Sequence, residues 1–195
     1  MTRAATVERK TNETDIHVAI NLAGSGTYNV QTGIGFFNHM LTQTIRHGFL
    51  DAEIISSGDI HVDCHHLVED TGIVLGQAFA KALGSKDGAH RYGSAIVPME
   101  DALALCAVDL SGRPYLFFDC HFTLHKLGDL DTEMIEEFFR AFCLNAGVNL
   151  HIKMLAGKNN HHMAEAIFKA FGQAIEQAVT VDPRIVGARS TKGIL

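Results

Sequence analysis

Apolar and polar positions alternate along several short segments of the chain, which is the period of a half-buried β-strand. In the first half the pattern predicts strands at residues 4–10, 15–22 and 51–56. In the second half it predicts strands at residues 94–99, 101–110, 114–121 and 149–155. The glycine-spaced segment 24–35 is expected to be a mobile or tightly turning loop.

Other segments repeat apolar residues at three- and four-residue spacings, which predicts amphipathic helices. These helices fall at residues 36–47, 65–83, 131–145 and 160–179. In the last of them Met163, Ile167, Phe171 and Ala174 belong to one apolar stripe that should face a core.

The order strand–strand–helix–strand–helix therefore occurs twice, and the spacing of glycines supports an internal duplication. The tripeptide Gly-Gln-Ala begins eleven residues after His65 and again eleven residues after His161. Two glycines ten residues apart also bracket the middle strand of each half, Gly48 with Gly58 and Gly147 with Gly157. The alternative, two similar amphipathic segments without common origin, does not account for several matches in order.

Composition narrows the class of protein. The chain has 195 residues, of which 47% are hydrophobic and 19% charged, so it can bury a sizeable core. A net charge of −6 argues against nucleic-acid binding, although it permits a local basic pocket for a small phosphate. The start of the chain has no apolar signal region and no apolar run reaches membrane length, so we expect a soluble cytoplasmic protein with no membrane partner.

The four cysteines, at positions 64, 106, 120 and 143, form no CxxC motif. We expect them to be buried free thiols in a reducing compartment.

Two segments share the pattern His-His-x-x-Glu at a predicted helix start, His65, His66 and Glu69, and His161, His162 and Glu165. Positions i and i+4 lie on one helical face, so the first histidine and the glutamate of each segment can grip one ion. The second histidine points about 100° away and can reach a different ion. If the segments face each other, each second histidine completes the other segment's site, which gives two metal sites related by a pseudo-two-fold axis.

A ligand set of imidazole and carboxylate suits a divalent ion of octahedral preference, such as manganese or iron. The alternative interpretation is that each histidine pair is only a polar cluster at a helix start, which two equally spaced copies disfavour. Segment 24–35 lacks the spacing of a P-loop and the third glycine of a dinucleotide-binding loop, so no nucleotide site is predicted.

Further segments make the chain similar to one known family. They are 8-ERKTNETDI-16, 32-TGIGFFNHML-41, 63-DCHHLVEDTGIVLGQA-78, 109-DLSGRPY-115, 157-GKNNHHMAEAIFKAF-171 and 190-STKG-193. Together they closely resemble imidazoleglycerol-phosphate dehydratase, an enzyme of histidine biosynthesis, over essentially the whole chain. No room remains for the phosphatase domain fused in some members, so we expect the monofunctional form.

The resemblance implies an α+β fold of the ribosomal protein S5 domain 2-like type. In that fold an internally duplicated strand–strand–helix–strand–helix unit forms two sheets packed on a helical layer. We expect one compact domain, with half-repeats at residues 1–92 and 93–195 and a C-terminal tail that contacts the substrate.

The resemblance also implies two Mn²⁺ ions per active site, bound in crossed fashion. One ion would take His39, His66, His161 and Glu165. The other would take His65, Glu69, His162 and the second-half residue that matches His39, which is Glu137. Many relatives place histidine there, and glutamate can ligate a hard ion but changes the charge of the site. Two interpretations stay open, Glu137 as a ligand, which we favour, or as a helix-surface residue with His151 as its substitute.

The implied reaction is the dehydration of D-erythro-1-(imidazol-4-yl)glycerol 3-phosphate to 3-(imidazol-4-yl)-2-oxopropyl phosphate (imidazoleacetol phosphate) by a manganese-dependent hydro-lyase. The hydrogen to be removed is not next to a carbonyl, so the imidazole ring must act as the electron reservoir. Metals on both ring nitrogens would give an imidazolate, which expels the neighbouring hydroxyl and leaves a diazafulvene-like intermediate. Loss of the next C–H proton then gives an enol, which becomes the ketone.

Proton transfer requires a positioned acid or base. Glu13 matches a family glutamate near the substrate and is the first candidate, although it could be only a polar residue before a strand. His47 and a metal-bound water are weaker candidates. The substrate-binding set that the resemblance implies comprises Glu13, His39, His47, Arg91, Arg113, Lys169, Ser190 and Lys192. Its arginines and lysines suit a phosphate, but each alone would more often be a solvated surface charge.

The family assembles into a 24-subunit homo-oligomer with active sites between subunits, and we expect the same here, with metal promoting assembly. A non-catalytic di-metal storage or binding protein is the alternative, but it has no need of Arg91, Arg113 and Lys192. A di-metal phosphate-ester hydrolase is a second alternative, disfavoured because few aspartates accompany the site.

Overall fold

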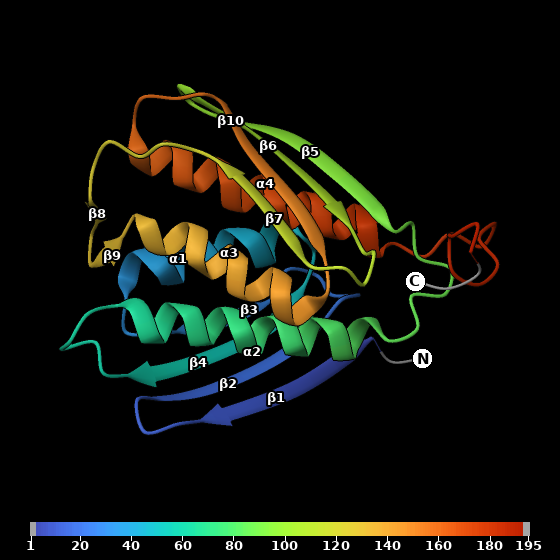
Figure 1. Cartoon of the computed structure of the whole chain (residues 1–195), viewed down its shortest axis with the longest axis horizontal. Helices are drawn as coiled ribbons and strands as arrows, with labels where there is room; N and C mark the ends of the chain where they lie inside the picture. Colours follow the sequence, from blue (N-terminus) through green and yellow to red (C-terminus); the bar gives the residue numbers. More distant parts are fainter. Residues whose placement is uncertain (1–2, 193–195) are drawn as a thin grey trace.

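The computed structural model describes residues 3–192, which form two four-stranded sheets, a two-stranded ribbon and four helices (Figure 1). The first half contains β1 (Ala4–Lys10), β2 (Thr14–Asn21), β3 (Tyr28–Gln31), α1 (Gly35–His47), β4 (Asp51–Gly58) and α2 (His65–Leu83). The second half contains β5 (Tyr92–Met99), β6 (Ala102–Asp109), β7 (Tyr115–Asp119), β8 (Lys126–Leu127), β9 (Leu130–Asp131), α3 (Glu133–Ala146), β10 (Asn149–Ala156) and α4 (Asn160–Val179). Gly193 of the STKG motif lies outside the described residues.

The two halves have the same topology, which confirms the predicted duplicated α+β fold. The sheet orders are β1-β2-β4-β3 and β5-β6-β10-β7. The two orders are the same when the strands of each sheet are numbered along the chain, since β7 then corresponds to β3 and β10 to β4. In both sheets the last edge strand runs parallel to its neighbour, while the other pairs are antiparallel. The half-repeat boundary between residues 92 and 93 stays a prediction; β5 begins at Tyr92.

The sequence-based expectation was wrong for segment 24–35, which contains the strand β3 as well as turns. Each unit is therefore strand–strand–strand–helix–strand–helix. β3 alternates, with Tyr28 and Val30 apolar and Asn29 and Gln31 polar, but four residues are too few for this period to identify a strand within a glycine-spaced segment. Its parallel pairing with β4, from Tyr28 opposite Ala52 to Gln31 opposite Ile55, holds it in an extended conformation.

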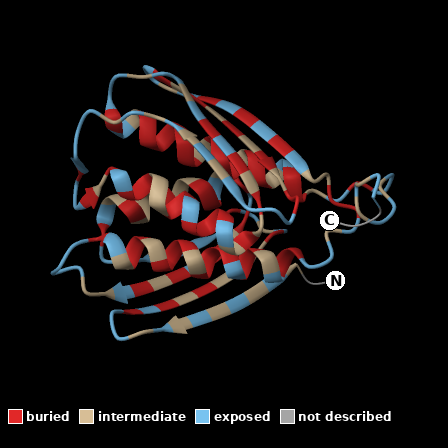
Figure 2. Cartoon of the chain, viewed as in Figure 1, coloured by how far each residue is buried: buried red, intermediate tan, exposed pale blue. Residues whose placement is uncertain are grey.

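The helices lie between the two sheets (Figure 1). α2 packs on β1 and β2, and α4 packs on β5 and β6, while α3 contacts α2 and α1 contacts α4. Buried positions lie on the inner faces of the sheets and along the helices between them, although α2 and α3 also carry exposed positions (Figure 2). Across residues 3–192, no helix combines the length and the apolar character needed to cross a membrane.

Aromatic rings fill the space between the helices. Phe139 of α3 lies 4.9 Å from Phe168 and 5.1 Å from Phe171 of α4, measured between ring centroids. Phe37 of α1 meets Phe138 of α3 edge-to-face at 5.3 Å. Such edge-to-face and offset contacts favour one relative placement of the helices, since the ring quadrupoles prefer them to face-to-face stacking.

The expectation of buried free thiols is confirmed for Cys64, Cys106 and Cys143, whereas Cys120 is only half-buried. Burial raises the pKa of Cys143 to about 12, so this thiol stays protonated and unreactive.

Gly172 allows α4 to approach α1 closely. A Cβ atom at this position would lie 2.5 Å from the carbonyl oxygen of Thr44 and 3.0 Å from the backbone nitrogen of Gly48. The hydroxyl of Thr44 also donates a hydrogen bond of 3.1 Å to the carbonyl of Phe168. The glycine in the repeated Gly-Gln-Ala tripeptide is therefore required by helix packing.

We expect Gly172→Ala to destabilise the protein by about 2 kcal/mol, because overpacking at a tight contact typically costs 1–3 kcal/mol. In a chain of this size that loss lowers the midpoint of thermal unfolding by about 4–8 °C, measurable by circular dichroism. Gly35→Ala is the matched control, since a Cβ at Gly35 would meet nothing within 4 Å. An unchanged midpoint in Gly172→Ala would show that the helices can separate without cost.

Candidate functional site

The first turn of α4 is fixed by its N-cap. The side chain of Asn159 accepts hydrogen bonds from the backbone N–H groups of His161, at 2.9 Å, and His162, at 3.3 Å. This cap satisfies donors that the first turn would otherwise leave free. Both histidines are thereby held on the first turn, in the predicted positions.

Three of the predicted metal ligands lie together where α1 meets α4. Nε2 of His161 is 3.3 Å from Oε2 of Glu165, and Nε2 of His39 is 3.8 Å from the same oxygen. One ligand atom from each of the three residues lies within 4.8 Å of the others. His39 comes from the first half of the chain, so the group joins the two halves.

Glu165 is a nearly buried carboxylate in this group, with 9% of its side chain exposed. Its other oxygen, Oε1, accepts a contact of 2.7 Å from Nζ of Lys169, one turn further along α4. Burial acts to raise the pKa of Glu165, but the hydrogen bond and charge of Lys169, together with His39 and His161, lower it overall. The carboxylate is therefore ionised at neutral pH, with one oxygen facing both imidazoles.

The matching turn of α2 holds a looser pair. Nε2 of His65 lies 3.9 Å from Oε2 of Glu69, and both side chains are more than one-third exposed. Glu137 occupies the fifth position of α3, as His39 does in α1. Its carboxylate lies 3.5 Å from Nε of Arg140, and among the described residues no third ligand joins His65 and Glu69.

The second histidine of each pair contacts an aspartate through Nδ1. His66 lies 3.0 Å from Oδ2 of Asp59, and His162 lies 2.7 Å from Oδ1 of Asp101. These bonds lower the pKa of both aspartates, and the bond from Asp59 raises the pKa of His66. Oε2 of Glu13, in the β1–β2 turn, is a further 3.8 Å contact of His66.

Within one chain, His66 and His162 thus do not join the predicted group of the opposite half. α2 and α4 rest on different sheets, with α3 and α1 between them. His151, the alternative ligand, lies on β10, where its ring stacks on Phe117 at 5.3 Å. His47 lies away from His39, in a hollow of about 470 Å³ that Phe49, Gln173 and Glu176 also line. Burial, followed by the charge of Lys169, lowers the pKa of His47.

Four of the predicted phosphate-binding residues line a separate hollow of about 440 Å³, whereas the prediction was wrong for Lys169, which lies beside Glu165 on α4. The hollow is lined by Arg91, Tyr92, Arg113, Arg189, Ser190, Thr191 and Lys192. Arg91 has a left-handed backbone, with φ of 73°, and its guanidinium donates to both oxygens of Asp109, at 2.7 and 3.1 Å. Its Nη1 also donates to the carbonyl of Arg189 at 2.9 Å, which ties the tail to the rest of the hollow.

The two sites lie at opposite ends of the chain's long axis (Figure 1). His161 is at the start of the 20-residue helix α4, and the tail that carries Ser190 and Lys192 follows its end. A helix of this length spans about 30 Å. One small molecule therefore cannot touch both sites of the same chain.

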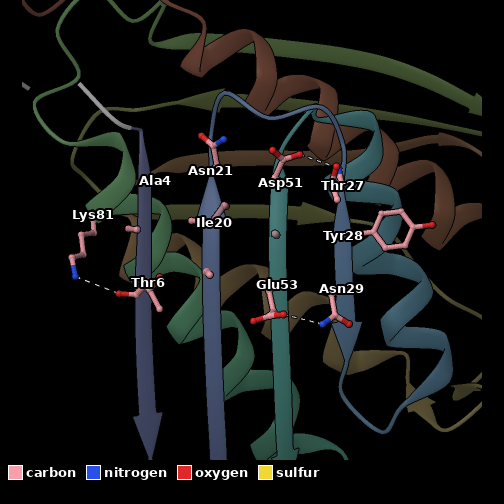
Figure 3. A pocket seen from close by; sticks show the side chains of 13 residues that line it. Ala4, Thr6, Ile20, Asn21, Thr27, Tyr28, Asn29, Asp51, Glu53 and Lys81 are labelled. Carbon is pink, nitrogen blue, oxygen red and sulfur yellow. Dashed lines mark hydrogen bonds between the residues drawn. The ribbon is translucent and has the colours of Figure 1, made fainter.

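A larger hollow, about 720 Å³, contains none of these groups. It lies on the outer face of the β1-β2-β4-β3 sheet, where Thr6 of β1, Asn21 of β2 and Glu53 of β4 line it (Figure 3). Size alone therefore does not identify the site.

Sequence reasoning missed Asp59, Asp101, Asp109 and Arg189 as partners of the predicted residues. Arg189 directly precedes the STKG motif, so its position was a usable signal. The three aspartates are brought in by strand and turn geometry, and no spacing along the chain marks them.

The fold and these side chains define a class of protein, namely duplicated α+β proteins with histidine–carboxylate groups on helices at one end and a cationic hollow at the other. The sequence pattern of the imidazoleglycerol-phosphate dehydratase (IGPD) family matches residues 32–175. The chain belongs to this family.

Relatives match along their whole length. The imidazoleglycerol-phosphate dehydratase of Clostridium botulinum (strain Langeland) is 56% identical over 191 residues, which cover 98% of this chain and 97% of the relative. That of Acetivibrio thermocellus is 55% identical over 195 residues, with 100% of both chains covered.

Solved structures agree. The crystal structure of the imidazoleglycerol-phosphate dehydratase of Staphylococcus aureus has a TM-score of 0.82 at 39% identity, covering 92% of this chain and 99% of that one. The crystal structure of IGPD from Pyrococcus furiosus, in complex with (S)-C348, has a TM-score of 0.83 at 35% identity, covering 97% and 100%.

Proposed function

We propose that this chain is a manganese-dependent hydro-lyase of the cytoplasm that dehydrates imidazoleglycerol phosphate to imidazoleacetol phosphate in histidine biosynthesis. The observation that carries the proposal is the group of His39, His161 and Glu165 in a chain that matches the family from end to end. His39, His161 and Glu165 would hold a divalent ion, which would supply Lewis acidity to the imidazole ring of the substrate.

The residues present fit such an ion. Two imidazoles and one carboxylate converge within 4.8 Å, a donor set that suits manganese, iron or zinc. Lys169 holds the second oxygen of Glu165, so the carboxylate is oriented before an ion arrives. On the other half, His65 and Glu69 would bind the second ion with His162, and Glu137 is the proposed fourth ligand.

Glu13 is the proposed proton carrier. Its side chain is 55% exposed, so a substrate can reach it, and it lies 3.8 Å from His66. As the acid, Glu13 can donate a proton to the leaving hydroxyl, and the resulting carboxylate can then accept the C–H proton, which restores the acid. His47 is the second candidate, because its lowered pKa keeps the imidazole neutral and able to accept a proton.

The substrate phosphate would bind in the hollow of Arg113, Ser190 and Lys192. Arg113 can donate two parallel hydrogen bonds to phosphate oxygens, while Lys192 acts as a point charge. Arg91 is held in place by Asp109 and has N–H groups left for the ligand.

Because the two ends of one chain are about 30 Å apart, we propose active sites between subunits of a 24-subunit assembly. An exposed apolar surface supports association. On the outer face of the β5-β6-β10-β7 sheet, Ile96 is 58%, Tyr115 55% and Phe117 40% exposed. Large apolar side chains exposed on one sheet face are consistent with an interaction surface in a soluble protein.

The test is to strip the protein of metal, restore Mn²⁺ and add imidazoleglycerol phosphate. We expect no turnover and smaller oligomers without metal, and formation of the ketone with metal. Release of inorganic phosphate would indicate a hydrolase, and metal binding without any product would indicate a storage protein. A large species that survives exhaustive chelation would contradict metal-promoted assembly.

A further inference from the structure

The second histidine of each pair makes the same contact in both halves of the molecule. In His66 and in His162 it is Nδ1 that meets an aspartate oxygen, at 3.0 and 2.7 Å. The first histidines behave differently, since His65 and His161 turn Nε2 toward the glutamate of their own helix. The two members of each pair therefore have separate roles.

The aspartates do not come from matching places in the duplicated unit. Asp59 follows β4, whereas Asp101 lies in the turn between β5 and β6. In the second half, Lys158 follows Gly157 at the place where Asp59 follows Gly58 in the first half. In the first half, Glu13 directly precedes β2 at the place where Asp101 directly precedes β6 in the second half. Glu13 also approaches Nδ1 of His66, at 3.8 Å, so the first half places two carboxylates near this ring atom. The closer one, that of Asp59, has no carboxylate counterpart in the second half.

This contact selects one form of the imidazole. An ionised carboxylate only accepts hydrogen bonds, so Nδ1 must carry the proton. In a neutral imidazole Nε2 then has a free lone pair, which is the atom a metal requires. Carboxylates that bond the far nitrogen of a ligating histidine fix its tautomer and ring orientation and make it a better donor.

The surroundings of the two aspartates differ from those of an ordinary surface ion pair, each in its own way. Oδ2 of Asp101 accepts the backbone N–H groups of Lys158 and Asn159 at 2.6 and 3.0 Å, so it is anchored to the loop that leads into α4. The side chain of Asp59 is 19% exposed, and its Oδ1 is buried with no hydrogen-bond partner in the described part of the chain. A buried oxygen without a hydrogen bond destabilises the fold. The presence of Asp59 at this position therefore indicates a functional role for its contact with His66.

We propose that Asp59 and Asp101 are positioning residues that hold the Nδ1–H of His66 and His162 and so present Nε2 of each ring to a divalent cation. This inference rests on the proposed metal-dependent function, and it assigns roles to two residues outside the predicted ligand set.

The test is Mn²⁺ titration of metal-free Asp59→Asn and Asp101→Asn proteins, with free Mn²⁺ followed by electron paramagnetic resonance. We expect each variant to bind Mn²⁺ about 10–100-fold more weakly at the affected sites, the usual effect of losing such a partner. At saturating Mn²⁺ we expect kcat to recover to within a few-fold of wild type in Asp59→Asn, which a misfolded protein would not show.

Asp87→Asn is the control, because Asp87 is exposed and accepts a hydrogen bond from Ser85 beyond the C-terminal end of α2, away from both helix starts. Asp59→Asn is the decisive variant, since the backbone bonds of Asp101 could by themselves disturb α4. An Asp59→Asn protein with wild-type affinity would overturn the inference, as would equal weakening in the control. If the wild type itself binds no Mn²⁺, the proposed function fails first, and the two failures are distinguishable.

Discussion

Replacing Glu165 with glutamine is expected to reduce kcat/KM about 10³-fold or more at any Mn²⁺ concentration. The amide removes the negative charge that faces His39 and His161, and it leaves the ammonium of Lys169 without its 2.7 Å partner beside the site. A divalent cation bound by His39, His161 and residue 165 then lacks an anionic ligand, and the unpaired ammonium of Lys169 repels it. Lewis-acid stabilisation is worth several kcal/mol, and each 1.36 kcal/mol corresponds to a factor of ten in rate.

Glu136→Gln is a matched control for this variant. Glu136 pairs with Arg140 at i+4 on α3, as Glu165 pairs with Lys169 on α4, but its side chain is 46% exposed. We expect activity within twofold of wild type, because exposed pairs of this kind contribute little to stability. Ketone formation and bound Mn²⁺ should be measured together. If Glu165→Gln keeps both within tenfold of wild type, Glu165 is not a ligand.

The long amphipathic helices could be predicted from the sequence because their signals are local. α2 was expected at residues 65–83 and spans His65–Leu83, since its apolar stripe runs without interruption up to Gly84. The sheets were harder to predict. β3 alternates over only four residues, which is too short a run to identify a strand, and its extended conformation depends on pairing with β4, twenty-four residues further along the chain.

The site was predictable where it follows helical spacing. His161 and Glu165, and His65 and Glu69, lie one turn apart, and that geometry follows from the positions alone. The approach of His39 was implied only by the family resemblance. It arises because Gly172 lets α1 rest against α4, a tertiary contact with no local signature.

The predicted crossed metal sites do not form within a single chain. The sequence suggested that each second histidine would complete the opposite site, but α2 and α4 do not face each other within a single subunit. His66 and His162 instead rest on Asp59 and Asp101. Completion of the crossed sites therefore remains a proposal about neighbouring subunits, and it can be tested without a structure of the assembly.

Mixing two inactive variants should restore activity if each active site combines the ends of different chains. In Glu165→Gln the metal-binding end is defective, and in Arg113→Ala the phosphate-binding end is defective. When metal-free proteins are mixed in equal amounts and reassembled with Mn²⁺, about one interface in four joins two intact ends, so we expect about a quarter of the wild-type rate. Neither variant alone, nor a mixture of Glu165→Gln with His161→Ala, should gain activity, because their defects lie at the same end. The proposal is wrong if the first mixture also stays inactive while gel filtration shows full-size particles. In that case the substrate does not bridge two subunits, and the active site does not combine the metal-binding end of one chain with the phosphate-binding end of another.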